Sequence, residues 1–295
     1  MKTRCLESQL GSIRSYPGGG RLKAVKRRRK TVATIGKLTK TMSVVAASKM
    51  VPAQQKAAAI SPFFTTMNKT FKDLTTEPKD GEKVLTLVIS TDKGLCGSTN
   101  NGLTRFLLKQ DLSSHSIVVW GDKGCGAFER SLYKNNVIFS AHPNQKTVLS
   151  FSEVCAVSDK LSKLDFDVCK VVFNKLISSS SPAIQQIYLP SLKRFTSDEA
   201  RNALTPYEIE ATADDELVVN MFEFFFASGL NYACFHNQAV EMFARRNSMD
   251  NATKNAKEVA KKLLLKFNRE RQAMITTELG EITSGAAAVE EGSKK

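Results

Sequence analysis

The sequence lacks several features that would mark a nucleotide-hydrolysing enzyme, a metal protein or a membrane-spanning protein. It has no GxxxxGKS/T phosphate loop, so the chain is not expected to hydrolyse ATP by that route. Its six cysteines form no CxxC pair, which favours reduced thiols in a reducing compartment. The most apolar run, residues 217–230, contains Glu223 and is far shorter than the roughly 20 residues that span a bilayer. We therefore do not expect an integral membrane protein.

Acidic residues are scarce, and residues 21–49 contain none. The formal net charge of +14 predicts an acidic partner, which is a nucleic acid, an anionic membrane surface or an acidic protein. The basic face of the N-terminal segment is either simply solvated or an electrostatic contact surface. Residues 1–16 are basic and contain several serines and a single acid, a composition that resembles an organellar transit peptide.

Histidine is also rare, and the sequence predicts no metal or cofactor site. His115, His142 and His236 are far apart, which favours surface or structural roles over metal ligation. The glycine-rich segment 121–126 follows a predicted strand. Its spacing is not GxGxxG and no suitable acid follows, so dinucleotide binding is not expected.

A second glycine-containing segment, which includes Asp92, Gly94, Cys96 and Gly97, follows the first predicted strand. Two glycines allow the backbone to turn tightly before a helix. A catalytic thiol would need a nearby base, and the sequence offers none. We interpret the segment as a structural turn with a buried cysteine.

A long amphipathic helix is predicted directly after the Pro-Gly-Gly-Gly segment at 17–20. At about 100° per residue, apolar side chains gather on one side and basic side chains on the opposite side. The apolar set is Val25, Val32, Ile35, Leu38, Met42 and Val45, and the basic set is Lys26, Arg29, Lys30, Lys37 and Lys40. Gly36 costs the helix about 1 kcal/mol relative to Ala. Pro52 should kink or interrupt it near Val51.

The middle of the chain alternates between predicted strands and predicted helices. Apolar runs typical of buried strands lie at 84–89, 117–120, 168–173 and 184–189, and helical stretches lie at 98–110, 123–133 and 151–164. This alternation predicts a Rossmann-like α/β domain with a mostly parallel sheet.

A second long helix is predicted from about residue 212 to residue 288, a stretch without proline. About 70 helical residues would extend about 105 Å. Its narrow apolar stripe is interrupted by Arg246, Thr253, Arg271 and Glu278, so we expect its far end to face another protein or solvent. Phenylalanines at 222 and 224–226 are expected to form core between this helix and the α/β domain.

These patterns predict an α/β protein with a long antiparallel coiled coil, in which the two terminal helices form a shaft. The expected divisions are an N-terminal extension at 1–20, a coiled-coil helix at 21–75, an α/β domain at 76–210, a coiled-coil helix at 211–289 and a tail at 290–295.

The motifs at 35–50, 90–97, 249–256, 271–279 and 284–288 together resemble the γ subunit of F-type ATP synthases, with the mitochondrial type as the best match. The resemblance covers about residues 21–289. It implies a non-catalytic rotor whose α/β domain forms a foot on the membrane c-ring. Its shaft would run inside a hexamer of α and β subunits beside δ/ε-type stalk subunits. It also implies a peripheral location on the matrix side of the mitochondrial inner membrane.

The resemblance also implies roles for single residues. Lys40, Met42, Arg271 and Gln272 match positions that contact a β subunit. The tip that turns in an apolar sleeve corresponds to Ile282, Ala286, Ala287, Ala288 and Val289. Tyr207 and Glu208 fall near the ring-contacting foot.

The chain departs from the family pattern at Gly36, Gly280 and Pro52, which put helix continuity in question, and it lacks the dithiol-bearing insertion of chloroplast members. Two other interpretations remain open at this point. One is a basic helical nucleic-acid-binding protein, whose affinity should fall steeply with salt. The other is a nucleotide-binding α/β enzyme with helical extensions.

Overall fold

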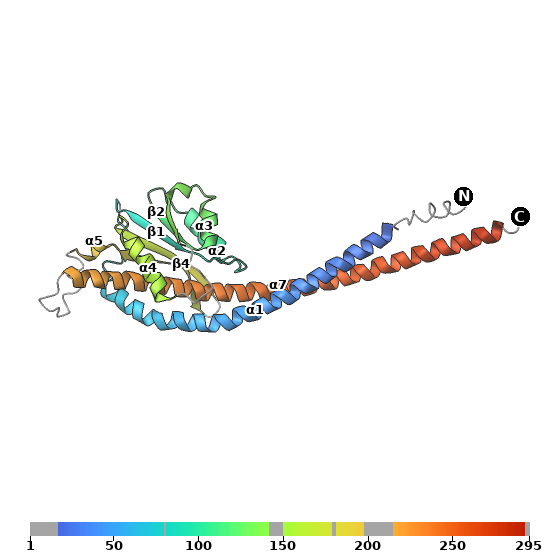
Figure 1. The fold of residues 1–295 in the computed structure, drawn as a ribbon, viewed down its shortest axis with the longest axis horizontal. Helices are drawn as coiled ribbons and strands as arrows, with labels where there is room; N and C mark the ends of the chain where they lie inside the picture. The colour runs from blue at the N-terminus through green and yellow to red at the C-terminus, as the bar shows by residue number, and fades with distance from the viewer. Residues whose placement is uncertain (1–16, 80, 142–149, 179–180, 198–214, 293–295) are drawn as a thin grey trace, which may run out of the picture. The chain divides into compact units, whose positions relative to one another are not determined.

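A computed structural model describes residues 17–79, 81–141, 150–178, 181–197 and 215–292 of the chain. Contacts divide the chain into two compact units. We call Ser43–Ser248 the sheet unit, and Met1–Met42 with Met249–Lys295 the helix-pair unit. Two long helices, α1 (Pro17–Thr70) and α7 (Asp215–Gly292), each contribute to both units (Figure 1).

The sheet unit is built on five strands in the order β3-β2-β1-β4-β5. The strands are β1 (Val84–Ile89), β2 (Ser116–Trp120), β3 (Val137–Ala141), β4 (Val168–Ser178) and β5 (Ser181–Pro190). β1 pairs in parallel with β2 and β4, β2 pairs in parallel with β3, and β5 is antiparallel to β4. Every residue of β1 is buried, as expected for a central parallel strand covered on both faces.

Helices cover the two faces of this sheet differently. Side chains from α2 (Thr99–Leu108) and α3 (Asp122–Phe128) form one small core with alternate residues of β1, β2 and β4. The larger core lies on the opposite face, under α1, α4 (Phe151–Ser162), the short α5 (Leu192–Phe195) and α7. A short 3-10 helix, Lys134–Asn136, precedes β3.

An aromatic cluster fills the larger core. Phe225 is fully buried and its ring lies 5.3 Å from that of Phe71 and 6.1 Å from those of Phe64 and Phe195. Phe222 and Phe226 pack beside it, whereas Phe224 is 49% exposed. The expected core role of this phenylalanine group therefore holds for three of its four members.

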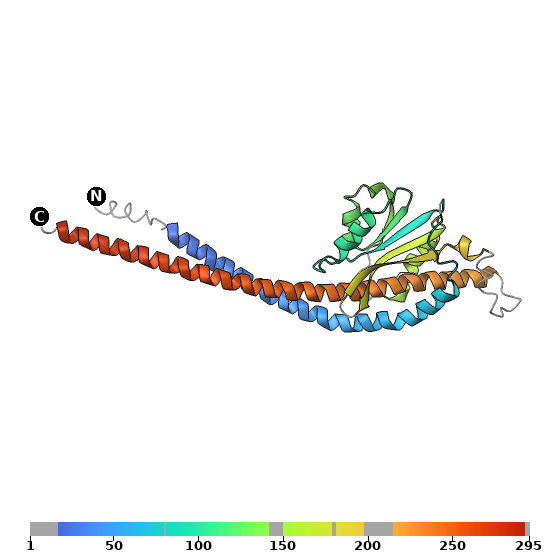
Figure 2. The same ribbon diagram turned by 180° about the vertical axis from the view of Figure 1, so that it is seen from behind.

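In the helix-pair unit, α1 and α7 lie side by side with opposite chain directions (Figures 1 and 2). The guanidinium of Arg29 lies 5.5 Å from the ring centre of Phe267, and Thr253 Oγ1 donates to Thr39 Oγ1 at 2.8 Å. A methyl group added at Gly36 would lie 3.3 Å from Ala256 Cβ, so this glycine permits the close approach of the two helices. The pairing confirms the predicted fold class, an α/β protein with an antiparallel coiled coil.

The expectation that Pro52 interrupts the N-terminal helix is wrong, because α1 is continuous from Pro17 to Thr70. Pro52 is exposed, and so is Ser48, whose carbonyl loses its helical donor there. Water can satisfy that carbonyl, so the missing bond does not break the helix. The helix also begins at Pro17 rather than after Gly20, since the fixed φ of proline suits a first helical position.

Other boundaries differ in detail. The predicted helix at 123–133 ends at Phe128, and β3 was not predicted at all. The long C-terminal helix, α7, does not end at Gly280 but extends to Gly292.

One helix among the described residues passes a length-and-composition test for a membrane span. Within Glu216–Val289, an 18-residue window has a mean hydropathy of 1.2, and 61% of that window is buried inside the structure. Core helices of folded domains pass the same test, so this is weak evidence for a span.

Candidate interaction sites on the helices and the sheet

Along residues 35–46 of α1, the inward face carries small side chains and the large apolar side chains face outward. Ser43 and Ala46 are 4% and 2% exposed, whereas Ile35, Leu38 and Met42 are 47%, 57% and 38% exposed. Of the apolar side chains predicted to share one side of α1, Val25 is buried and Val32 is half-buried, but the others are exposed, so most of that set lies outside the seam between the helices. Small seam residues allow close helix approach and leave the large ones available for another surface.

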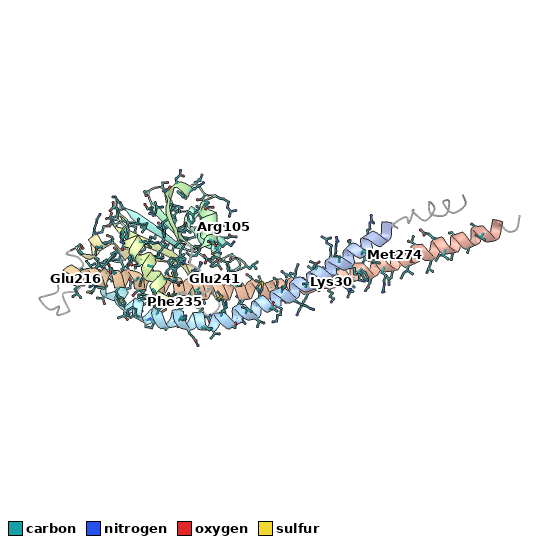
Figure 3. All side chains as sticks on the ribbon, viewed as in Figure 1. Lys30, Arg105, Glu216, Phe235, Glu241 and Met274 are labelled. Atoms are coloured by element: carbon teal, nitrogen blue, oxygen red, sulfur yellow. The ribbon has the colours of Figure 1, made fainter. Side chains whose placement is uncertain are left out.

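Lys40 is exposed on the basic face of α1, and Figure 3 shows Lys30 on the same helix. The basic set of α1 is exposed except for Arg29, which is half-buried against Phe267. Its exposed lysines would attract an acidic surface.

The C-terminal part of α7 is exposed along its length. Arg271 and Gln272 are exposed, and Ile275, Ile282 and Val289 are 47%, 67% and 72% exposed. Ala286, Ala287 and Ala288 are exposed as well. Of the four polar residues that interrupt the apolar stripe of this helix, Thr253 alone is buried. Thr39 of α1 accepts its hydrogen bond.

The turn after β1 is compact and internally hydrogen-bonded. Cys96 is 2% exposed, and Asn100 Nδ2 donates to its sulfur at 3.3 Å. Asp92 Oδ1 accepts from the amide of Asp122 at 3.1 Å, which ties the turn to the start of α3. Leu95 and Gly97 have φ values of 65° and 64°, in the left-handed region that disfavours side chains.

The glycine-rich segment at 121–126 packs closely against the end of β1. Added Cβ atoms at Gly121 and Gly124 would lie 2.8 and 2.6 Å from Ser90 Oγ. That hydroxyl accepts from the amide of Gly124 and donates to the carbonyl of Trp120. These glycines are explained by close packing between α3 and β1.

The histidines of the described residues are structural. His236 is 7% exposed and hydrogen-bonds to Ser61 at 2.9 Å; burial and the nearby Lys175 lower its pKa to about 4. Burial also lowers the pKa of His115, whose Nδ1 lies 2.8 Å from the Thr86 hydroxyl. His142 lies outside the described residues. No group of three metal-ligating side chains occurs in the part of the chain that the structure describes.

Two of the predicted site residues, Tyr207 and Glu208, also lie outside the described residues. The sequence analysis missed a buried polar row on α7, formed by Asn237, Glu241 and Arg245 (Glu241 is labelled in Figure 3). The only signal in the sequence was a Glu–Arg pair four residues apart in an otherwise apolar helical segment.

A paired-helix shaft with an exposed apolar end, joined to a small α/β domain, defines a stalk-type subunit of a larger assembly. A family model described as ATP synthase matches residues 21–289. The chain is 33% identical over 292 residues to the mitochondrial ATP synthase subunit gamma of Yarrowia lipolytica, with 95% of each chain covered. It is 34% identical over 287 residues to the mitochondrial ATP synthase F(1) complex subunit gamma of Dictyostelium discoideum, covering 91% of this chain and 92% of that one. The chain belongs to the ATP synthase γ-subunit family.

A solved structure agrees with this assignment at the level of the fold. A chain in the mitochondrial ATP synthase of Euglena gracilis, in rotational state 3, superposes with a TM-score of 0.82 at 19% identity. The match covers 94% of this chain and 97% of the other. The comparisons give no support to the nucleic-acid-binding alternative.

Proposed function

We propose that this chain is the central-stalk rotor of an F-type ATP synthase. It transmits torque between a proton-driven c-ring and a catalytic hexamer of α and β subunits during ATP synthesis or hydrolysis. The observation that carries this function is α7, a single unbroken helix of 78 residues, about 117 Å long. It begins in the core of the sheet unit and ends in an exposed helix pair, as a torque-bearing shaft requires.

Lys40, Met42, Arg271 and Gln272 are the proposed contacts with β subunits. All four are exposed, and Lys40 lies on the basic face of α1. A cation on a rotating surface would attract acidic groups of a surrounding subunit at each of its stopping positions.

The proposed bearing tip consists of the exposed side chains Ile282, Ala286, Ala287, Ala288 and Val289. Exposed apolar surface of this kind is unfavourable in water and favours an apolar sleeve. Three consecutive alanines give this sleeve little to interlock with, which suits free rotation. From the resemblance alone, Tyr207 and Glu208 are proposed to lie near the c-ring.

The chain itself is proposed to be non-catalytic and to need no cofactor, with nucleotide sites held by its α and β partners. δ/ε-type stalk subunits are its other proposed neighbours. The proposed location is the matrix side of the mitochondrial inner membrane, which is supported by the mitochondrial relatives and the basic, serine-containing residues 1–16.

The β-contact proposal is tested by replacing Arg271 and Gln272 together with Ala and measuring ATP turnover and proton pumping of the purified complex. Arg269→Ala is the matched control. It removes the same charge from an exposed position that lies about 200° around the helix from Arg271. We expect the double variant to lower coupled turnover and the control to leave it unchanged. Unchanged turnover and pumping in the double variant would count against these contacts.

A further inference from the structure

The carboxyl ends of β1 and β4 are the place where the order of the parallel strands reverses. From β1 the chain passes through α2, β2 and α3 to β3 on one side. It then crosses through α4 to β4, on the other side of β1. Sheets of this kind bind ligands at such a switch point, beyond the carboxyl ends of the strands. In this chain, polar side chains of α7 occupy that position.

Asn237 joins the two strands where their ladder ends. Its Nδ2 donates to the carbonyl of Ser90 at 3.2 Å. Its Oδ1 accepts from Asn174 Nδ2 at 3.0 Å and from the Asn174 amide at 3.4 Å. The last ladder pair, Val88 with Val172, lies two residues earlier. The side-chain amide of Asn237 thus satisfies backbone groups that the separating strands no longer satisfy for each other.

Arg245 attaches the same face of α7 to the turn that follows β1. Its Nη2 donates to the carbonyls of Lys93 and Gly94, both at 3.3 Å, and to Glu241 Oε1 at 2.6 Å. The side chains of Arg245 and Glu241 are only 11% and 3% exposed. Hydrogen bonds from a guanidinium in such a position are short-range and directional, so they fix the turn against the helix.

The turn that Arg245 holds is conformationally strained and closely packed. Leu95 has a φ of 65° and is 60% exposed, so packing of its own side chain does not explain this conformation. A Cβ at Gly97 would lie 2.8 Å from Ser248 Oγ, one helical turn beyond Arg245. The turn is thus pressed onto α7, and residues 237, 241, 245 and 248 form one face of the helix.

We propose that Asn237, Glu241 and Arg245 form a polar clamp at the switch point, through which the sheet and α7 turn as one body. The clamp takes the place of a ligand at this end of the sheet. It makes the three side chains positioning residues for the coupling of rotation, and this role rests on the rotor function proposed above.

The clamp would couple the sheet to α7 because polar contacts resist rotation of a helix better than apolar contacts do. The aromatic core between α7 and the sheet resists separation, but apolar burial is non-directional and resists rotation of a helix less well. The clamp groups bind fixed backbone atoms of two strands and a turn, so rotation of α7 against the sheet must break them. Beyond the clamp, α7 continues into the helix-pair unit as the same helix.

The test uses the whole ATP synthase, purified through a tag on this chain and reconstituted in vesicles. Arg245→Lys keeps the charge beside Glu241 but loses the guanidinium nitrogen, Nη2, that donates to both carbonyls. Glu241→Gln combined with Arg245→Met removes both charges and leaves no unpaired buried ion. Arg246→Met is the matched control, since the neighbouring arginine contacts Met50 Sδ of α1 at 4.0 Å. Protons pumped per ATP hydrolysed are measured in complexes of equal subunit content.

We expect both clamp variants to hydrolyse ATP with a pumping ratio lowered at least about twofold, and the Arg246 control to keep the wild-type ratio. A side chain that only stabilises the fold would reduce the yield of complex and leave this ratio unchanged. Equal ratios in all four proteins, or an equal fall in the control, would overturn the clamp. If the double variant does not assemble, Arg245→Lys decides the question. A wild-type chain that recovers no α and β subunits would instead overturn the rotor function.

Discussion

His236 should make the stability of this chain sensitive to mild acid. The imidazole packs 4.4 Å from the Tyr232 ring and faces the Ser61 hydroxyl at 2.9 Å. That hydroxyl donates its proton to the Ala57 carbonyl, so the hydrogen-bond network assigns the imidazole proton to Nε2. A neutral ring satisfies this site. Protonation would place a charge in the core, and burial, together with the nearby Lys175, lowers the pKa of His236 to about 4.

The sign of the pH dependence follows from this lowered pKa. Well above pH 6.5 the ring is neutral in both folded and unfolded chains, so the full stability is present. As the pH falls from 6.5 toward 4, the unfolded chain takes up a proton that the folded chain does not, and stability is lost. With pKa values of about 6.5 unfolded and about 4 folded, the loss between pH 8 and pH 5 is about 2 kcal/mol.

His236→Gln removes the titration and keeps an amide donor near the position of Nε2. Urea unfolding of the full chain, followed by fluorescence of its single tryptophan, Trp120, would give the free energy of unfolding at pH 5 and pH 8. We expect the wild-type chain to lose about 2 kcal/mol more than this variant. His115→Gln, at a half-buried histidine, should give a smaller difference. An identical pH dependence in wild type and His236→Gln would refute the reasoning.

Two further substitutions test the packing of the sheet unit by urea unfolding. Phe225→Ala should lower the free energy of unfolding by about 3–5 kcal/mol because the ring is fully buried, whereas Phe224→Ala, at a 49% exposed ring, should lower it much less; similar losses would contradict the assigned core. Gly124→Ala should destabilise by about 1–3 kcal/mol, since its Cβ would lie 2.6 Å from Ser90 Oγ. The control Gly102→Ala meets open space in α2 and should stabilise by up to about 1 kcal/mol; a tolerated Gly124→Ala would be inconsistent with the close contact.

The fold class could be predicted because its main signals are local. β1, β2 and β4 are buried on both faces, so their sequences are short continuous apolar runs. β3 escaped prediction because it lies at the sheet edge, where Ile138 and Ser140 are exposed and the apolar run is broken. Edge strands of this length carry little sequence signal.

The contact face of α1 in the helix pair was not predicted, because the large apolar side chains that the helical period gathers on one side are mostly exposed. On α1 the seam runs through Gly36, Thr39, Ser43 and Ala46, at alternating spacings of three and four residues. Small residues leave room for close helix approach but carry little hydrophobic signal. Met42 belongs to the large apolar set that remains exposed.

The candidate sites also differ in how far the sequence could predict them. The proposed β contacts and the bearing tip came from a family resemblance, since exposure on a helix gives no local motif. The clamp joins residues that are far apart in the sequence, such as Ser90 with Asn237 and Gly94 with Arg245. Only the three-dimensional arrangement brings them together.

The most direct test of the rotor function is to purify the native complex through a tag on this chain and count its partners. The rotor function predicts one copy of this chain with α and β ATPase subunits in equal numbers, together with c-ring subunits. Recovery of nucleic acid, or of no ATPase subunits, would contradict it.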